Sequence, residues 1–323
     1  MTNIFKSLII VLLALYFSLG WSADKYPSKP ITVIVPFPAG GPLDQTIRLL
    51  GPKMTASLGQ PIIIDNKGGA AGLVGANAVA KASPNGYTLL FSSVGALAIV
   101  PNITSSMPYN PQKDLDAITQ VVKVPTILVV ASSSKYETFG DLLNDAKANP
   151  EKINYASAGS GTNTHLAVEL LKREAKINVN HIPYRGAAPA ITDLLGGQVE
   201  FMIADAPVVL PFIKDGKLRA LAVTSAKRIP VLSGTPTTAE LGYPKVEVYN
   251  WYGMLAPSKT PKEIIDRLYL AVKEAAQSPE LKTQFADQGI EVVTSKPSEF
   301  GPFILAETAR WGALARSVGA KLE

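Results

Sequence analysis

Two loops rich in glycine and small residues are the segments of this sequence best suited to hold a ligand. Pro38-Ala-Gly-Gly41 precedes a helix-like segment that contains Asp44, and Gly159-Ser-Gly-Thr-Asn-Thr164 precedes one that contains His165. The N-terminus of a helix has unpaired backbone N–H groups and a partial positive charge, and glycine lets a ligand approach the backbone closely. Each loop therefore either binds an anion such as a carboxylate, phosphate or sulfate, or only turns the chain.

The second loop adds hydroxyl and amide donors from Ser160, Thr162, Asn163 and Thr164. One such loop falls in each half of the chain. If the two halves face each other, the loops could grip opposite ends of one molecule that has an anionic group at each end.

The composition excludes several kinds of site. The chain has no Cys and two His, His165 and His181. Disulfides, thiolate nucleophiles, iron–sulfur clusters and Cys-type zinc sites are therefore excluded, and we expect no metal and no cofactor. The net charge of +5 comes from 31 Lys+Arg against 26 Asp+Glu. Without a run of five basic residues, the sequence does not predict a nucleic-acid partner.

Common catalytic motifs are missing. There is no G-x-x-x-x-G-K-[ST], no H-E-x-x-H and no G-x-S-x-G. An alternative stays open in which the protein is a secreted hydrolase or isomerase, with Ser160 as nucleophile and His165 as base. His165 equally suits a local hydrogen bond or a pocket wall.

Two carboxylates also leave alternatives open. Asp205 follows the strand-like run Val199–Ile203, and open α/β sheets bind ligands at the carboxyl ends of their strands. As a ligand group it would accept from a hydroxyl or an amine; otherwise it caps the next segment. Asp44 either stabilises a helix end or forms part of a pocket wall.

The N-terminus predicts export from the cytoplasm. Lys6 precedes the twelve-residue, almost wholly apolar run Leu8–Leu19, and the small residues Gly20, Ser22 and Ala23 follow it. This order is typical of a secretory signal peptide, and the run is shorter than the roughly 20 residues of a membrane span. We expect residues 1–23 to be a cleaved signal peptide.

The rest of the chain alternates strand-like and helix-like segments, which predicts βαβ units and an α/β fold. Short β-branched runs predict strands at 31–35, 61–65, 87–91, 126–130, 153–156, 179–183, 199–203 and 218–223. Apolar residues at helical spacing predict helices at 43–58, 73–82, 139–148, 164–175, 188–195, 261–277, 279–288 and 298–318. Pro52 is expected to kink or split the first of these helices.

This alternation restarts near residue 126, which predicts two similar α/β lobes. The chain is expected to cross between them near 124–126 and again near 249–253. The first lobe would then contain residues 24–125 and 250–323, and the second lobe residues 126–249.

Motifs spread along nearly the whole mature chain resemble one family. They run in order as Pro36-Phe-Pro-Ala-Gly-Gly-x-x-Asp44, Ala82-x-Pro-x-Gly-Tyr-Thr-Leu-Leu90, Tyr155-x-Ser-x-Gly-Ser-Gly161, Pro183-Tyr-x-Gly186, Asp193-Leu-Leu-Gly-Gly-Gln-Val199 and Trp251-x-Gly-x-x-Ala-Pro257. Together they resemble the Bug or TctC-type receptors, the periplasmic solute-binding proteins of tripartite tricarboxylate transporters.

The resemblance implies a two-lobed, type II periplasmic-binding-protein fold. Each lobe would be a mostly parallel sheet flanked by helices, with the ligand cleft between the lobes. A ligand carboxylate would be held by backbone and water at Ala39–Gly41, and the other end of the ligand would meet Ser160–Thr162. The residues expected to bind the ligand are Phe37, Ala39, Gly40, Gly41, Asp44, Ser92, Ser157, Ser160, Gly161, Thr162, His165, Tyr184 and Asp205.

The resemblance also implies a function without catalysis. A monomeric periplasmic protein would capture a small organic carboxylate and deliver it to the membrane permease subunits of the transporter. Di- and tricarboxylates, acidic amino acids and aromatic acids all remain open as ligands.

Overall fold

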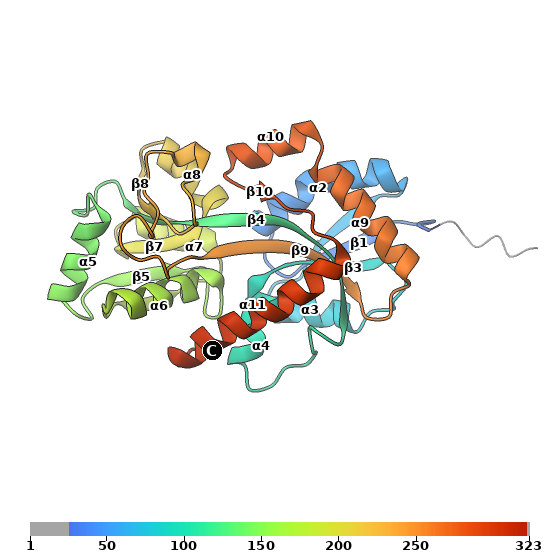
Figure 1. Cartoon of the computed structure of the whole chain (residues 1–323), viewed down its shortest axis with the longest axis horizontal. Coiled ribbons are helices and arrows are strands. Elements are labelled where there is room, and N and C mark those ends of the chain that lie inside the picture. Colours follow the sequence, from blue (N-terminus) through green and yellow to red (C-terminus); the bar gives the residue numbers. More distant parts are fainter. Residues whose placement is uncertain (1–25, 322–323) are drawn as a thin grey trace, which may run out of the picture.

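Two α/β lobes lie side by side along the long axis of the molecule in the computed structural model, which describes residues 26–321 (Figure 1). Two long strands, β4 (Leu115–Ala131) and β9 (Tyr249–Pro257), run along the middle (Figure 1). The expected signal peptide, residues 1–23, lies outside the described residues. Within 26–321, none of the helices combines the length and the apolar character that crossing a bilayer requires.

The first lobe is built on three parallel strands. β1 (Ile31–Val35) lies between β2 (Ile62–Asn66) and β3 (Thr88–Ser93). We propose that this lobe also contains α2 (Pro42–Leu58), the 3₁₀ turn η1 (Ala70–Gly72), the π-helix η2 (Gly95–Ile99), α3 (Leu73–Ala80), α4 (Val100–Ile103), α9 (Lys262–Ala276), α10 (Pro279–Asp287), β10 (Glu291–Val292) and α11 (Pro297–Ser317).

The second lobe repeats this plan. β5 (Asn154–Ser157) lies between β6 (Asn180–Pro183) and β7 (Phe201–Asp205) and is parallel to both. The other elements are α5 (Phe139–Ala148), α6 (Asn163–Ala175), α7 (Ala187–Leu195), α8 (Ala206–Lys214), β8 (Leu218–Val223) and the short turn η3 (Pro230–Leu232).

Strand β4 changes its partners where the two lobes meet. Up to Pro125 it pairs antiparallel with β9, and from Thr126 onward it pairs antiparallel with β7 and β8. A single strand thus belongs to the sheets of both lobes. We propose that β4 and β9 form the hinge and that the lobes divide at 125/126 and 249/250.

Parallel strands direct their carboxyl ends to one edge of each sheet, and the loops that follow them gather there. The loop after β1 leads into α2, the loop after β5 leads into α6, and β7 leads directly into α8. These three junctions therefore lie on the edges of the two lobes that adjoin the hinge.

Pro52 was expected to kink or split helix α2, and the structure has one helix of 17 residues that runs through Pro52, so the helix is not split. Pro52 removes one helical hydrogen bond, but Ile47, Leu50 and Met54 on the two flanking turns are fully buried against the core. Tertiary packing therefore outweighs the local cost of the proline.

Trp251 belongs to the core rather than to a ligand site. Its indole Nε1 donates to Glu307 Oε2 on α11 (3.0 Å), and Trp311 Nε1 donates to the same oxygen (2.9 Å). Both indoles are 1% exposed. This shared carboxylate fixes α11 to the strand β9.

Candidate ligand-binding site

A cavity of about 710 Å³ opens between the two lobes at the carboxyl ends of their strands. Four helices begin at this cavity, and their N-cap residues Gly41, Thr162, Gly186 and Asp205 all line it. The volume is in the range of about 300–1,000 Å³ that is typical of small-molecule sites. Because each helix N-terminus carries a partial positive charge, the cavity favours an anionic ligand.

The first loop is shaped by a hydrogen-bond network behind it. The N–H of Gly40 and the Nε of Arg48 both donate to Asp44 Oδ2, at 2.9 and 2.8 Å. Asn66 Nδ2 donates to Asp44 Oδ1 (3.0 Å) and to the carbonyl of Phe37 (3.1 Å). Gly40 has a φ of +80°, a conformation that suits glycine. This network fixes the conformation of the loop, whose residues 38–42 line the cavity.

Asp44 supports this loop and does not form part of the cavity wall. Its side chain is 2% exposed, and both of its oxygens have partners. Burial works against the ionised form, but hydrogen bonds from Arg48, the Gly40 N–H and Asn66 outweigh it, so the pKa of Asp44 lies below its ordinary value. Of the two roles left open by the sequence, the structure gives it the one at the helix end.

The second loop uses its own hydroxyl groups to hold its shape. Thr162 Oγ1 donates to the carbonyl of Gly159 (2.7 Å) and accepts from the N–H of His165 (3.4 Å), as an N-cap does. Thr164 Oγ1 accepts from the N–H of Ala158 (3.0 Å) and lies 2.9 Å from Thr162 Oγ1. Both hydroxyls are thus engaged within the loop while Thr162 and Thr164 line the cavity.

A Thr162→Ala variant should lose about 1 kcal/mol of stability, because it loses the N-cap and the link to Gly159. We expect ligand affinity to fall by a similar amount, since the loop is then less ordered. Urea unfolding and a binding titration measure the two effects, and Thr162→Ser is the matched control that keeps the hydroxyl. Lower affinity with unchanged stability would mean that the hydroxyl contacts the ligand directly.

The two histidines stack on each other behind the second loop. The ring centroids of His165 and His181 are 4.1 Å apart, with 6° between the ring planes. The N–H of Gly161 donates to His165 Nδ1 (3.3 Å), so this nitrogen is already engaged. Ser157 Oγ accepts from the N–H of Gly159 (3.1 Å) and lies 2.6 Å from His181 Nε2, to which its hydroxyl can donate. Both imidazoles therefore help to position the loop.

Burial lowers the pKa of both histidines. The pKa of His165 falls to about 4, mainly through burial and then through Lys172. The pKa of His181 falls to about 3 through burial, then His165 and Lys172, and only Glu169 opposes the change. Both rings are neutral in the folded protein at pH 7.

Stability should therefore decline as the pH falls below 6.5. The unfolded chain takes up protons that the folded protein does not, at His165 down to about pH 4 and at His181 down to about pH 3, and this favours unfolding. Above pH 6.5 these two groups leave stability unchanged. Since the chain has two histidines, proton NMR can follow both imidazoles directly. Neither should titrate above pH 5, and a midpoint near 6.5 for either would contradict this explanation.

Asp205 joins the two lobes at the hinge. Its carboxylate accepts from Asn163 Nδ2 on α6 (2.9 Å), and from Asn250 Nδ2 (2.7 Å) and Tyr252 OH (2.9 Å) on β9. Burial raises the pKa of Asp205, and the three donors oppose that rise. The side chain makes no capping bond to α8, so the capping role left open by the sequence is not the one it has.

Among residues 26–321, Arg185 is the one cationic side chain that lines the cavity. It is exposed and forms no hydrogen bond or ion pair within residues 26–321. A guanidinium group can hold a carboxylate with two parallel hydrogen bonds. With the N-terminus of α7, which begins two residues later, Arg185 gives the second lobe an anion-binding edge.

The structure brings only part of the expected site together. The expected residues that line the cavity are Phe37, Ala39, Gly40, Gly41, Thr162 and Asp205. The expected residues that do not line it are Asp44, Ser92, Ser157, Ser160, Gly161, His165 and Tyr184.

For three of the residues that do not line the cavity, the structure gives a clear physical reason. Ser92 is fully buried, and its neighbour in β3, Ser93, lines the cavity instead, because successive side chains of a strand point to opposite faces. Ser157 is fully buried against His181. Tyr184 directs its hydroxyl to Asp193 Oδ2 (2.7 Å).

Other lining residues were not among the expected ligand-binding set. Arg185 falls at the variable position of Pro183-Tyr-x-Gly186, so the motif itself gave no reason to select it. Asn250 lies where the chain was expected to cross between the lobes, and that crossing was the signal that could have found it.

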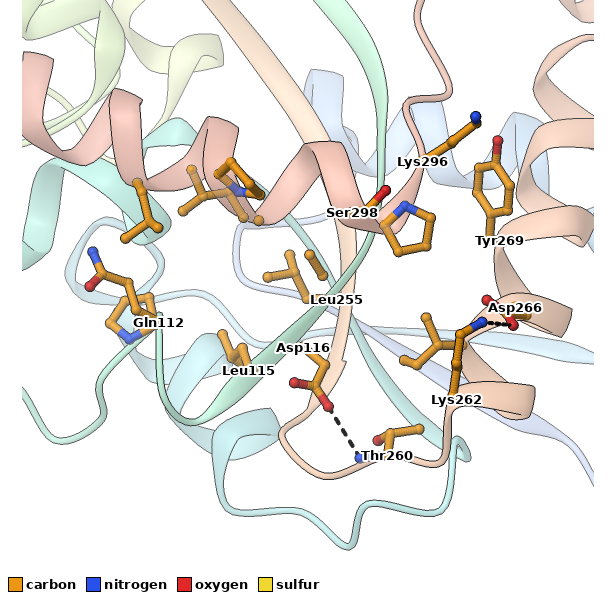
Figure 2. Close-up of a pocket in the computed structure, with 18 of the residues that line it drawn as sticks. Gln112, Leu115, Asp116, Leu255, Thr260, Lys262, Asp266, Tyr269, Lys296 and Ser298 are labelled. Carbon is orange, nitrogen blue, oxygen red and sulfur yellow. Dashed lines mark hydrogen bonds and ion pairs between the residues drawn. The ribbon is translucent and has the colours of Figure 1, made fainter.

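A second cavity, of about 860 Å³, lies on the first lobe between α9 and α11 (Figure 2). Two pairs join polar groups of this cavity: Asp116 accepts from the N–H of Thr260 (3.2 Å), and Lys262 pairs with Asp266 (Figure 2). Neither glycine-rich loop reaches it, and it does not lie between the lobes. We therefore place the candidate site in the interlobe cavity.

Comparisons with known proteins match most of the chain. A family model described as "Tripartite tricarboxylate transporter family receptor" matches residues 46–320. Protein BugT of Bordetella pertussis (strain Tohama I) is 40% identical over 303 residues, which cover 94% of this chain and 93% of that protein.

Solved structures agree with this fold. The structure of periplasmic binding protein BugD has a TM-score of 0.86 and 35% identity, covering 92% of this chain and 99% of that one. A structure of R. palustris Rpa4515 with adipate has a TM-score of 0.88 and 33% identity, again covering 92% of this chain and 99% of that one.

Proposed function

This chain belongs to the tripartite tricarboxylate transporter receptor family, and from that premise we propose that it is a periplasmic solute-binding protein. It captures a small organic carboxylate between its lobes and delivers the solute unchanged to the membrane permease of such a transporter. The observation that carries this proposal is the convergence of four helix N-termini and Arg185 on one interlobe cavity.

Each lobe supplies part of the site. The first lobe offers the backbone at Ala39–Gly41, and the second offers Arg185 and the N-termini of α6 and α7. A ligand that contacts both lobes stabilises a closed arrangement over an open one, and β4 and β9 would bend as the hinge. The permease would then distinguish the loaded receptor from the empty one.

Location and partners follow from the same proposal. Residues 1–23 act as a signal peptide that is removed on export, and the mature protein works in the periplasm as a monomer. The relative BugD is described as a periplasmic binding protein, which supports this location. The partners are the permease subunits in the inner membrane.

Catalysis by Ser160 and His165 is the rival function. His165 Nδ1 already accepts from the Gly161 N–H, and Ser160 does not line the cavity. We therefore propose that the chain has no catalytic activity and that the ligand leaves unchanged.

A thermal-shift screen of the purified mature protein tests this function. Malate, citrate, glutamate, adipate and benzoate form the panel, and at least one should raise the melting temperature. A ligand at 100 times its Kd adds about 2.7 kcal/mol of stability. Mass spectrometry after incubation should recover that ligand intact. No shift with any carboxylate, or conversion of the ligand, would overturn the proposed function.

A further inference from the structure

We propose that the ligand is a monocarboxylate with a bulky apolar body. This body is either an aromatic ring or a branched or medium-length aliphatic group. This inference rests on the proposed function, because it concerns the ligand of the same cavity. The observation behind it is an apolar wall on the second lobe that shares one cavity with the anion-binding edges of both lobes.

The apolar wall comes from β7, α7 and α8. Its side chains are those of Ile191, Leu195, Val208 and Phe212, and the almost fully buried Met202 and Ala204 also line the cavity. None of these side chains has a hydrogen-bond donor or acceptor apart from the weak thioether acceptor of Met202. A polar arm of a ligand placed here would lose its water partners without replacement, whereas an apolar body gains by leaving water.

The anion-binding edges of both lobes are made of small residues. Ala39 and Gly41 form the edge on the first lobe, and Ala187 and Ala188 follow Arg185 on the second lobe. These small residues let a carboxylate reach backbone N–H groups. An apolar body attached to that carboxylate can then lie against the wall.

The charges that line the cavity favour one carboxylate over two. Within the part of the chain that the structure describes, Arg185 is the single cation among the lining side chains, and Asp205 is the single anion. Asp205 already accepts three hydrogen bonds that hold its carboxylate in place. A second ligand carboxylate would add negative charge to a cavity that already contains Asp205. No second cationic side chain from residues 26–321 lines the cavity, so that carboxylate would have only helix N-termini as partners.

Binding titrations with five acids test the class of ligand. Benzoate, cyclohexanecarboxylate and octanoate represent apolar monocarboxylates, and adipate and malate represent dicarboxylates. We expect at least one apolar acid to bind about tenfold or more tighter than either dicarboxylate. Tighter binding of adipate or malate would overturn this inference and leave the proposed function intact. Failure of all carboxylates to bind would overturn both.

A pair of matched variants tests the position of the wall. Val208→Thr puts a hydroxyl into the wall at nearly constant volume, and Val74→Thr makes the same change at a 49% exposed position of α3 outside the cavity. Val208→Thr should weaken the apolar acid about fivefold or more and leave weak dicarboxylate binding unchanged. Val74→Thr should change neither. Equal affinity of the Val208→Thr and Val74→Thr variants for the apolar acid would overturn the inference.

Discussion

A Gly41→Asp variant should bind carboxylates about a thousandfold more weakly and still fold as stably as the wild-type protein. Gly41 is the N-cap of α2 and lines the cavity. A second carboxylate about 4 Å from that of the ligand costs about 4 kcal/mol at an effective dielectric constant of about 20, which corresponds to about three orders of magnitude in Kd. Aspartate is a favoured N-cap residue, so the helix itself is not weakened.

Two further substitutions at the same position separate charge from size. The backbone of Gly41 is extended, with φ −73°, and a Cβ there meets no atom nearer than the carbonyl of Pro38 at 3.4 Å. Gly41→Ala should therefore bind almost as the wild-type protein does. Gly41→Asn should be intermediate, because its side chain occupies the helix N–H groups without adding charge. Calorimetric titration gives the three Kd values. Retained affinity in Gly41→Asp would remove the first loop from the site.

Much of the fold is encoded locally and could be predicted. The run at 31–35 matches β1, the predicted helix 279–288 matches α10 (Pro279–Asp287), and the predicted helix 298–318 matches α11 (Pro297–Ser317). β-branched runs, and apolar residues at helical spacing with a proline at the start, can be recognised in the sequence without knowledge of the tertiary structure.

Elements that depend on distant partners were missed. Only residues 126–130 of β4 were predicted, because residues 115–125 form a strand through pairing with β9 more than a hundred residues later. Helix α8 was missed as well. It contains Pro207 near its start and Pro211 inside, and such a pattern resembles a loop in the sequence.

The same distinction applies to the site. The two glycine-rich loops follow from the order strand, loop, helix, and both contribute to the cavity. The sequence predicts less well which side chain faces the cavity. A shift of one residue along β3 places Ser93 at the cavity in place of Ser92. The partners of Asp205 on β9 could not be found from the sequence, since they depend on how β9 crosses the hinge.

An Asp205→Ala variant should lose about 3–5 kcal/mol of stability. The change removes the shared acceptor of Asn163, Asn250 and Tyr252, which are all buried. Leaving a buried donor without a partner costs about 1–3 kcal/mol for each group. The substitution also removes a buried carboxylate, whose burial is unfavourable and raises the pKa of Asp205. This gain offsets part of that cost. Urea unfolding with and without ligand measures the loss.

Asp205→Asn is the informative comparison, because it keeps the shape and removes the charge. Its amide oxygen can accept from Asn250 and Tyr252, and its NH₂ can donate to Asn163 once that amide turns over. We therefore expect a loss below about 1 kcal/mol, with monocarboxylate affinity unchanged or higher because a negative charge has left the cavity. Asp215→Ala, an exposed position at the other end of α8, is the control and should change neither quantity. If Asp205→Ala were as stable as this control, the three donors would not need Asp205 as a hydrogen-bond acceptor. The position of Asp205 at the hinge would then have to be explained by contact with the ligand alone.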